Sequence, residues 1–145
     1  MIKKSVFWGG ARVTYAALSL LLVGAMLTGT ASARDDEVRL RTRLSGAAIG
    51  GVAPSGNAEF RMEAARQRTR LKVEVEDVNL PQGTKLQVVL DHAGVKTVVG
   101  QIVLDAFGFG ELELNSQDGD NVPAVKPGDV IIVMHGTTAI LSGVL

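Results

Sequence analysis

Residues 69–76 read Thr-Arg-Leu-Lys-Val-Glu-Val-Glu, in which charged and apolar side chains alternate without a break after the first threonine. Successive side chains of a β-strand point to opposite faces, which places Leu71, Val73 and Val75 on one side and the charged residues on the other. An amphipathic α-helix would instead repeat its apolar residues every three or four positions. The stretch therefore predicts a β-strand with one buried face and one solvated face.

Comparable patterns recur along the chain, separated at roughly every 8–12 residues by turns that contain Gly and Pro. Further strand patterns cover residues 37–45, 58–64, 85–91, 95–104, 111–114, 130–134 and 139–145. After residue 33, the one helical pattern is a single turn at residues 63–68. About eight short antiparallel strands predict an all-β, immunoglobulin-like or Greek-key β-sandwich, and a closed barrel is the alternative architecture.

The N-terminus has the layout of a secretory signal peptide. The basic residues Lys3, Lys4 and Arg12 precede an apolar stretch at residues 13–27, which is short for a membrane span. Ala31-Ser32-Ala33 then supplies the small residues of a cleavage site, with Ala31 and Ala33 at the positions that signal peptidase recognises. The prediction is a signal peptide at residues 1–33 and one secreted or periplasmic domain at residues 34–145. Membrane contact is then expected only through the signal peptide before cleavage, and an uncleaved anchor is the alternative.

The amino-acid composition excludes several kinds of partner and of stabilising bond. The chain has no cysteine, which excludes disulfides and a lipid-anchored cysteine. Its only Trp and Tyr, Trp8 and Tyr15, fall within the predicted signal peptide, so the mature domain lacks a platform for stacking bases, and no nucleic-acid partner is expected. Residues 34–72 carry a net positive charge and residues 73–145 a net negative charge. This asymmetry fits either a polyanion-binding face or, as we favour, a solvated face with cross-strand ion pairs.

Several short segments resemble the CHRD domain, a β-sandwich module named after chordin and common in exported bacterial proteins. The matching segments are Leu44-Ser45-Gly46-Ala47, Leu90-Asp91-His92-Ala93-Gly94, Val133-Met134-His135-Gly136 and Ile140-Leu141-Ser142-Gly143-Val144-Leu145. Asp91 stands where the family usually has the first histidine of a pair, and the family's Gly-Glu-Ile-Arg-Gly ending is reduced to residues 140–143. The resemblance implies a β-sandwich outside the cytoplasm, and it implies that the two histidines lie near each other.

His92 and His135 are the only histidines of the chain, and both lie in turn-like sequence beside predicted strands. Together with Asp91 they form a candidate set of two imidazoles and one carboxylate, which suits Zn²⁺ or Cu²⁺. The alternative is two independent surface histidines, which the sequence favours because it shows no ligand spacing.

A second candidate metal site lies at Asp118, Asp120 and Asn121, where acids and an amide crowd together. Calcium prefers six to eight oxygen ligands, and the glutamate that closes an EF-hand loop is missing here. Asp118-Gly119 is also a strong turn signal, because glycine accepts positive φ and aspartate bonds to its own backbone. We therefore expect these residues to turn the chain rather than to bind Ca²⁺.

No pattern for catalysis stands out. There is no cysteine nucleophile and no Gly-x-Ser-x-Gly elbow, and the carboxylate pairs alternate with Leu and Val as solvent-facing strand residues do. The sequence predicts a non-enzymatic structural or interaction module of the bacterial cell envelope or extracellular space, without a cofactor. Its unknown partner would add a strand beside the C-terminal strand at residues 139–145. A Zn- or Cu-binding protein that uses His92 and His135 is the alternative.

Overall fold

A computed structural model describes residues 36–145, so the predicted signal peptide and its Ala31–Ala33 cleavage signal lie outside the described residues. The described chain forms eight strands and two single 3₁₀ turns, η1 (Ala64–Arg66) and η2 (Ser116–Asp118). The strands are β1 (Glu37–Ser45), β2 (Ser55–Glu63), β3 (Arg68–Glu76), β4 (Lys85–His92), β5 (Val95–Val103), β6 (Gly110–Asn115), β7 (Val130–His135) and β8 (Thr138–Val144). The predicted all-β chain of about eight strands is confirmed, and η1 falls within the one helical turn that the sequence indicated.

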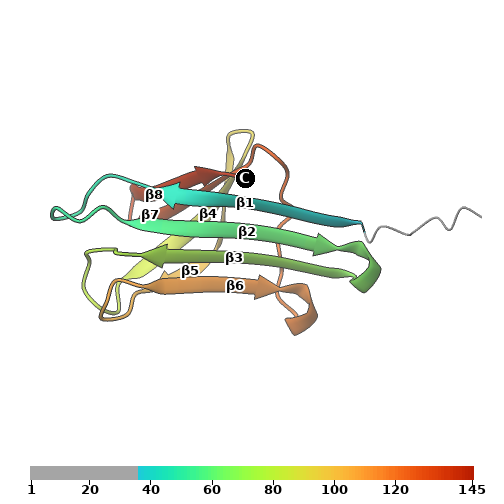
Figure 1. Cartoon of the computed structure of the whole chain (residues 1–145), viewed down its shortest axis with the longest axis horizontal. Helices are drawn as coiled ribbons and strands as arrows, with labels where there is room; N and C mark the ends of the chain where they lie inside the picture. The colour runs from blue at the N-terminus through green and yellow to red at the C-terminus, as the bar shows by residue number, and fades with distance from the viewer. Residues whose placement is uncertain (1–35) are drawn as a thin grey trace, which may run out of the picture. The chain divides into compact units, whose positions relative to one another are not determined.

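The strands pair antiparallel in a single sheet of order β5-β4-β7-β8-β1-β2-β3-β6. Figure 1 shows β1, β2, β3 and β6 side by side in front, with β8, β7, β4 and β5 behind them. The two halves join at β8 and β1 through one paired position, Ser45 with Ser142. At the other side β5 and β6 also approach each other. A Cβ added to Gly100 in β5 would meet the Leu112 side chain of β6. The sheet is therefore folded over on itself and nearly closed.

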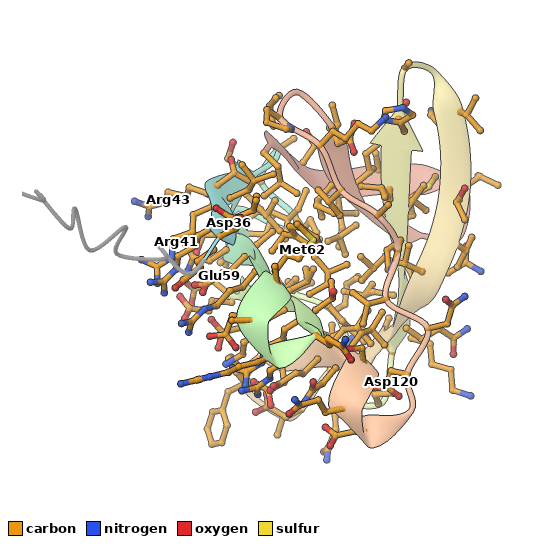
Figure 2. All side chains as sticks on the ribbon, turned by 90° about the vertical axis from the view of Figure 1, so that its right-hand side faces the viewer. Asp36, Arg41, Arg43, Glu59, Met62 and Asp120 are labelled. Carbon is orange, nitrogen blue, oxygen red and sulfur yellow. The ribbon has the colours of Figure 1, made fainter. Side chains whose placement is uncertain are left out.

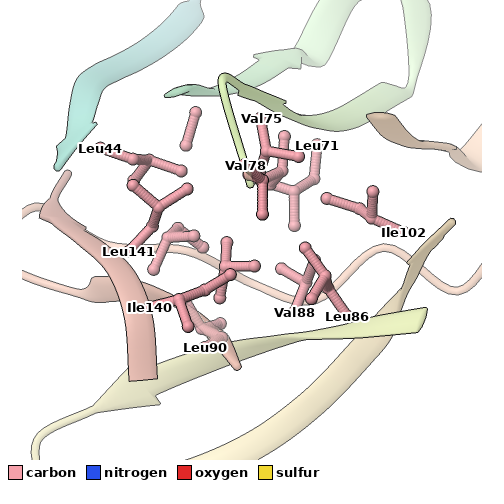
Figure 3. Packing of buried hydrophobic residues seen from close by; sticks show 14 of the residues in the cluster. Leu44, Leu71, Val75, Val78, Leu86, Val88, Leu90, Ile102, Ile140 and Leu141 are labelled. Atoms are coloured by element: carbon pink, nitrogen blue, oxygen red, sulfur yellow. The ribbon is translucent and has the colours of Figure 1, made fainter. Parts of the chain in front are cut away.

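The hydrophobic core fills the space between the two halves (Figure 3). Leu71, Val73 and Val75 are fully buried, as their alternation with charged residues predicts. From the other half, Leu86 and Ile131 pack into the same cluster. Because both halves contribute, neither buries its apolar side chains without the other.

Gly46 and Gly100 each lie at a close approach between the two halves. A Cβ added at Gly46, just after β1, would overlap the backbone carbonyl of Ile140 in β8. A Cβ added at Gly100 in β5 would meet only the end of the Leu112 side chain of β6, at 2.6 and 2.8 Å. The first contact is with backbone, so the β1–β8 corner is the less tolerant of the two.

The structure corrects the expectation of a free edge at the C-terminal strand. β8 lies between β7 and β1, and the two ends of the sheet are β5 and β6. Ile140 and Leu141 draw β8 inward because both are buried in the core. The side of β8 that faces β1 is paired only at Ser142, but β8 is not a terminal strand of the sheet.

Candidate functional site

His92 and Asp129 form a close polar pair at one end of β4 and β7. The β4–β7 ladder pairs Asp91 with Val130, which brings the following residue of β4 beside the residue before β7. His92 Nδ1 lies 2.6 Å from Asp129 Oδ1. The imidazole is half-exposed, at 49%, whereas the carboxylate is 4% exposed. The half-exposed His92 ring therefore lies over the buried Asp129 carboxylate.

Asp129 is held by its own turn as well as by the histidine. Its Oδ2 accepts a hydrogen bond from the Lys126 backbone N–H at 2.8 Å, and its backbone carbonyl accepts one from Leu145 N–H at 2.8 Å. Burial acts to raise the pKa of this carboxyl, but the Lys126 N–H, the bond to His92 and the charges of both side chains outweigh burial and lower the pKa below its usual 3.8. Asp129 thus stays ionised and ties β4, β7 and the C-terminal residue together.

The candidate Zn or Cu ligands do not converge. Along β7 the register runs from Asp91 opposite Val130 to Gln87 opposite Met134, so His135 follows at the far end of the ladder from His92. At about 3.3 Å per residue, the six residues from Asp129 to His135 separate the two histidines by roughly 20 Å. Asp91 uses its Oδ1 to accept a bond from Gly94 N–H in the β4–β5 turn. Within residues 36–145 no group of three or more His, Cys, Asp or Glu side chains is placed to hold a metal ion.

The carboxylates of the candidate calcium loop serve the turn after β6. Asp120 Oδ2 accepts a hydrogen bond from the Asn115 backbone N–H, and Asp118 Oδ2 accepts one from the Asn115 side-chain amide, each at 2.9 Å. Gly119 follows with φ of +88°, a conformation that favours glycine. Asp118 and Asp120 are therefore both engaged by the buried Asn115, and Asn121 lies in the exposed segment that follows.

The outer face of β1, β2, β3 and β6 carries only charged, amide and hydroxyl side chains, and we call it the charged face. Its members are Glu37, Arg39, Arg41, Arg43, Ser45, Ser55, Asn57, Glu59, Arg61, Glu63, Arg68, Arg70, Lys72, Glu74, Glu76, Glu111, Glu113 and Asn115. Figure 2 shows Arg41, Arg43 and Glu59 on one outer side of the domain. Because acids and bases are interleaved on it, the charged face fits the solvated alternative better than a polyanion-binding surface.

Ion pairs connect the strands of the charged face. Glu59 lies between two arginines, 2.9 Å from Arg39 Nη2 and 2.7 Å from Arg41 Nε. Lys72 Nζ is 2.7 Å from Glu74, and this hydrogen bond raises the pKa of Lys72 despite the opposing effect of burial. An open hollow of about 510 Å³ lies over this face, and its lining residues are Arg41, Thr42, Arg43, Asn57, Ala58, Glu59, Lys72 and Glu74. Both acids of the hollow are ion-paired, Glu59 with Arg41 and Glu74 with Lys72.

The outer face of β5, β4, β7 and β8 has the opposite character. Side chains that alternate with the core residues of these strands point away from the core, and most of them are apolar. We call the following set the outer apolar face: Val89, Val98, Val103, Val130, Ile132, Met134, Ala139 and Val144. The β-ladders align Val98, Val89 and Ile132 as one continuous row across three strands.

Exposure varies across this face, because Val89 is only 4% exposed and Ile132 and Met134 are half-buried, whereas the valines near its margins are open to water. Val98 and Val103 are each 55% exposed and Val144 is 60% exposed. The polar residues of the same face are Asp91 and Lys96, which are cross-strand neighbours at one end, Lys85 at the other end, and Gln87, Gln101 and Ser142 between them. Exposed apolar side chains gathered on one face of a sheet are a usual mark of an interaction surface. We therefore take the outer apolar face as the candidate functional site.

Sequence patterns missed both features for different reasons. The strand pattern at residues 130–134 is a continuous apolar run, whereas a strand with one solvated face should alternate. An apolar residue at each position was therefore the signal of a second apolar face. The His92–Asp129 contact joins residues far apart in the chain, and it depends on β4–β7 pairing, for which the sequence has no local signal.

Comparison with protein-family models gives no match, and comparison with curated proteins gives none either. No helix within residues 36–145 is long and apolar enough to cross a membrane.

Proposed function

We propose that the chain is an exported structural or interaction module of the bacterial cell envelope or extracellular space, and that it acts by binding rather than by catalysis. The observation that supports this function is the contrast between its two outer faces. One is a balanced network of ion pairs, which water solvates well, and the other presents valines that are more than half exposed. Exposed apolar area costs about 25 cal/mol per Å² in water, so a face of this kind is better explained by a partner than by solvent.

We further propose that the fold is a β-sandwich and that the protein is exported with cleavage of its signal peptide. The two packed halves support a β-sandwich of the immunoglobulin-like or Greek-key type. The segments around His92 and His135 resemble the CHRD domain, which agrees with an exported β-sandwich. The layout of residues 1–33 supports export with cleavage after Ala33.

Expression of the full chain in a bacterial host tests whether the protein is exported and cleaved. We expect protein outside the cytoplasm with the intact mass of residues 34–145, measured by mass spectrometry. A matched Ala31→Leu, Ala33→Leu variant should keep residues 1–33, because bulky side chains do not fit the peptidase pocket. Full-length protein that stays in the cytoplasm in both cases would contradict export.

Cross-linking in the source cells tests the binding role. Lys85 and Lys96 flank the outer apolar face, so an amine-reactive reagent should link the module to its partner through these two residues. Cross-links that involve only Lys72, on the charged face, would contradict the assignment of the binding face.

A further inference from the structure

We propose that the outer apolar face binds a second copy of the same chain, so that the working form of the protein is a two-fold symmetric dimer. This inference rests on the proposed binding function and names its partner. It follows from the arrangement of charge around the apolar residues, together with the size of the face.

Two of the three charged residues of the outer apolar face, Lys85 and Asp91, are self-complementary. Lys85 and Asp91 both point outward on β4, at opposite ends of the strand. A two-fold axis that lies between the copies, perpendicular to the strands, sets β4 of one copy antiparallel over β4 of the other. Asp91 of each copy then faces Lys85 of its partner, which gives two equivalent pairs of opposite charge. Identical surfaces that satisfy each other in this way are the basis of isologous dimers.

The same axis sets apolar side chains against each other on β7, whereas on β4 and β5 it sets Val89 over Gln87 and Val98 over Gln101. Ile132 and Met134 occupy neighbouring outward positions of β7, so strand reversal sets Ile132 of one copy over Met134 of the other. The sheets would pack in the aligned manner of two apolar β-faces, about 10 Å apart. The charged face cannot serve as the opposing surface, because its ion-paired arginines and glutamates would lose their water.

The area of the face sets the expected affinity. Four strands about 4.8 Å apart give a width near 19 Å, and six residues of strand give about 20 Å, or roughly 400 Å² in the plane of each copy. About 800 Å² for both copies is below the standard size of a stable protein complex, so we expect a weak, concentration-dependent dimer. A membrane surface fits less well, since Phe, Trp and Tyr are absent from the face and only Lys85 and Lys96 are basic.

Sedimentation velocity of the exported, processed protein over about 1 μM to about 1 mM tests the dimer. We expect a shift from monomer to dimer across this range. Ile132→Lys, at the centre of the face, should weaken the association at least tenfold. Val98→Lys should do the same, and its site is 55% exposed, so the fold tolerates the change. Asn57→Lys, the matched control on the charged face, should leave the dimer unchanged.

Charge reversal tests the arrangement of the two copies. Asp91→Lys alone should weaken the dimer, and Asp91→Lys with Lys85→Asp should restore most of the lost affinity. A monomer at every concentration would overturn the inference, as would a dimer that resists both Ile132→Lys and Val98→Lys. If the protein is monomeric but is cross-linked to a different protein through Lys85 or Lys96, the proposed binding function stands and the self-association fails. Binding to phosphatidylcholine vesicles in place of self-association would also overturn it.

Discussion

At the scale of single residues, Asp129 makes more stabilising hydrogen bonds than its position in a loop suggests. Its carboxylate accepts hydrogen bonds from His92 and from the Lys126 backbone, and its own carbonyl fixes the C-terminal Leu145. A buried donor that loses its acceptor costs more than the bond itself contributes, because the donor has been removed from water. The acids at 118 and 120, by contrast, bond within one turn and hold no second strand.

Replacement of Asp129 by Ala should lower the free energy of unfolding by about 1–3 kcal/mol, because the Lys126 N–H and the His92 ring both lose their acceptor. His92→Ala should cost less, since the imidazole is half-exposed and water replaces its bond. Urea denaturation followed by circular dichroism measures both changes. Asp36→Ala, at an exposed position before β1, is the control. Equal losses for Asp36→Ala and Asp129→Ala would show that the His92–Asp129 contact does not stabilise the fold.

The lowered pKa of Asp129 predicts a specific dependence of stability on pH. In the unfolded chain this carboxyl has its usual pKa near 3.8, whereas in the folded protein the pKa is lower. As the pH falls below 3.8, the unfolded chain therefore binds the proton first, and acid favours unfolding. The stabilisation is fully present above that pH and is lost as the pH falls through the folded pKa. The urea midpoint should thus fall more steeply below about pH 4 in the native protein than in Asp129→Asn, and parallel curves would refute this assignment.

At the scale of strands, the fold depends on how the two halves meet at their corners. β1, β2 and β3 pair along their whole lengths, but β1 and β8 share only one paired position. The corner is instead fixed by close packing, with Gly46 directly against the Ile140 carbonyl. Close packing of this kind leaves no room for a side chain at the glycine.

Gly46→Ala should therefore destabilise the protein by about 1–3 kcal/mol or more, because backbone in β8 has to move. Gly100→Ala, at the opposite corner, is the matched comparison. Its Cβ meets only the flexible end of Leu112, so its cost should be smaller. Thermal unfolding of the two variants beside the native protein measures the difference. A larger loss for Gly100→Ala would mean that the β5–β6 corner, and not the β1–β8 corner, limits the fold.

The alternation at residues 69–76 was sufficient to predict which side chains enter the core, because a period of two assigns each residue to a face without knowledge of strand order. Strand order itself was not predictable. The C-terminal strand was expected at an edge, yet β8 lies inside the sheet. The pairing of β4 with β7 joins distant segments, and it is this pairing that brings His92 to Asp129 and takes it away from His135.

At the scale of the whole molecule, the two outer faces of the sheet differ in character and, in our account, in role. The charged face offers water a network of ion pairs, each of which stabilises an exposed surface by only about 0.2–1 kcal/mol. The outer apolar face carries its charged residues, Lys85, Asp91 and Lys96, only at its ends, and its middle row of Val98, Val89 and Ile132 crosses three strands. The central claim is that this second face is covered in the working protein, and that a second copy covers it.

The absence of cysteine allows a direct measurement of that claim, because one introduced thiol is the only thiol in the molecule. Val98→Cys places it on the outer apolar face, and Asn57→Cys places it on the charged face. With a short bis-maleimide at concentrations where the protein self-associates, we expect covalent dimers for Val98→Cys and almost none for Asn57→Cys. Equal yields from the two variants, or dimers formed only through Asn57→Cys, would contradict the account.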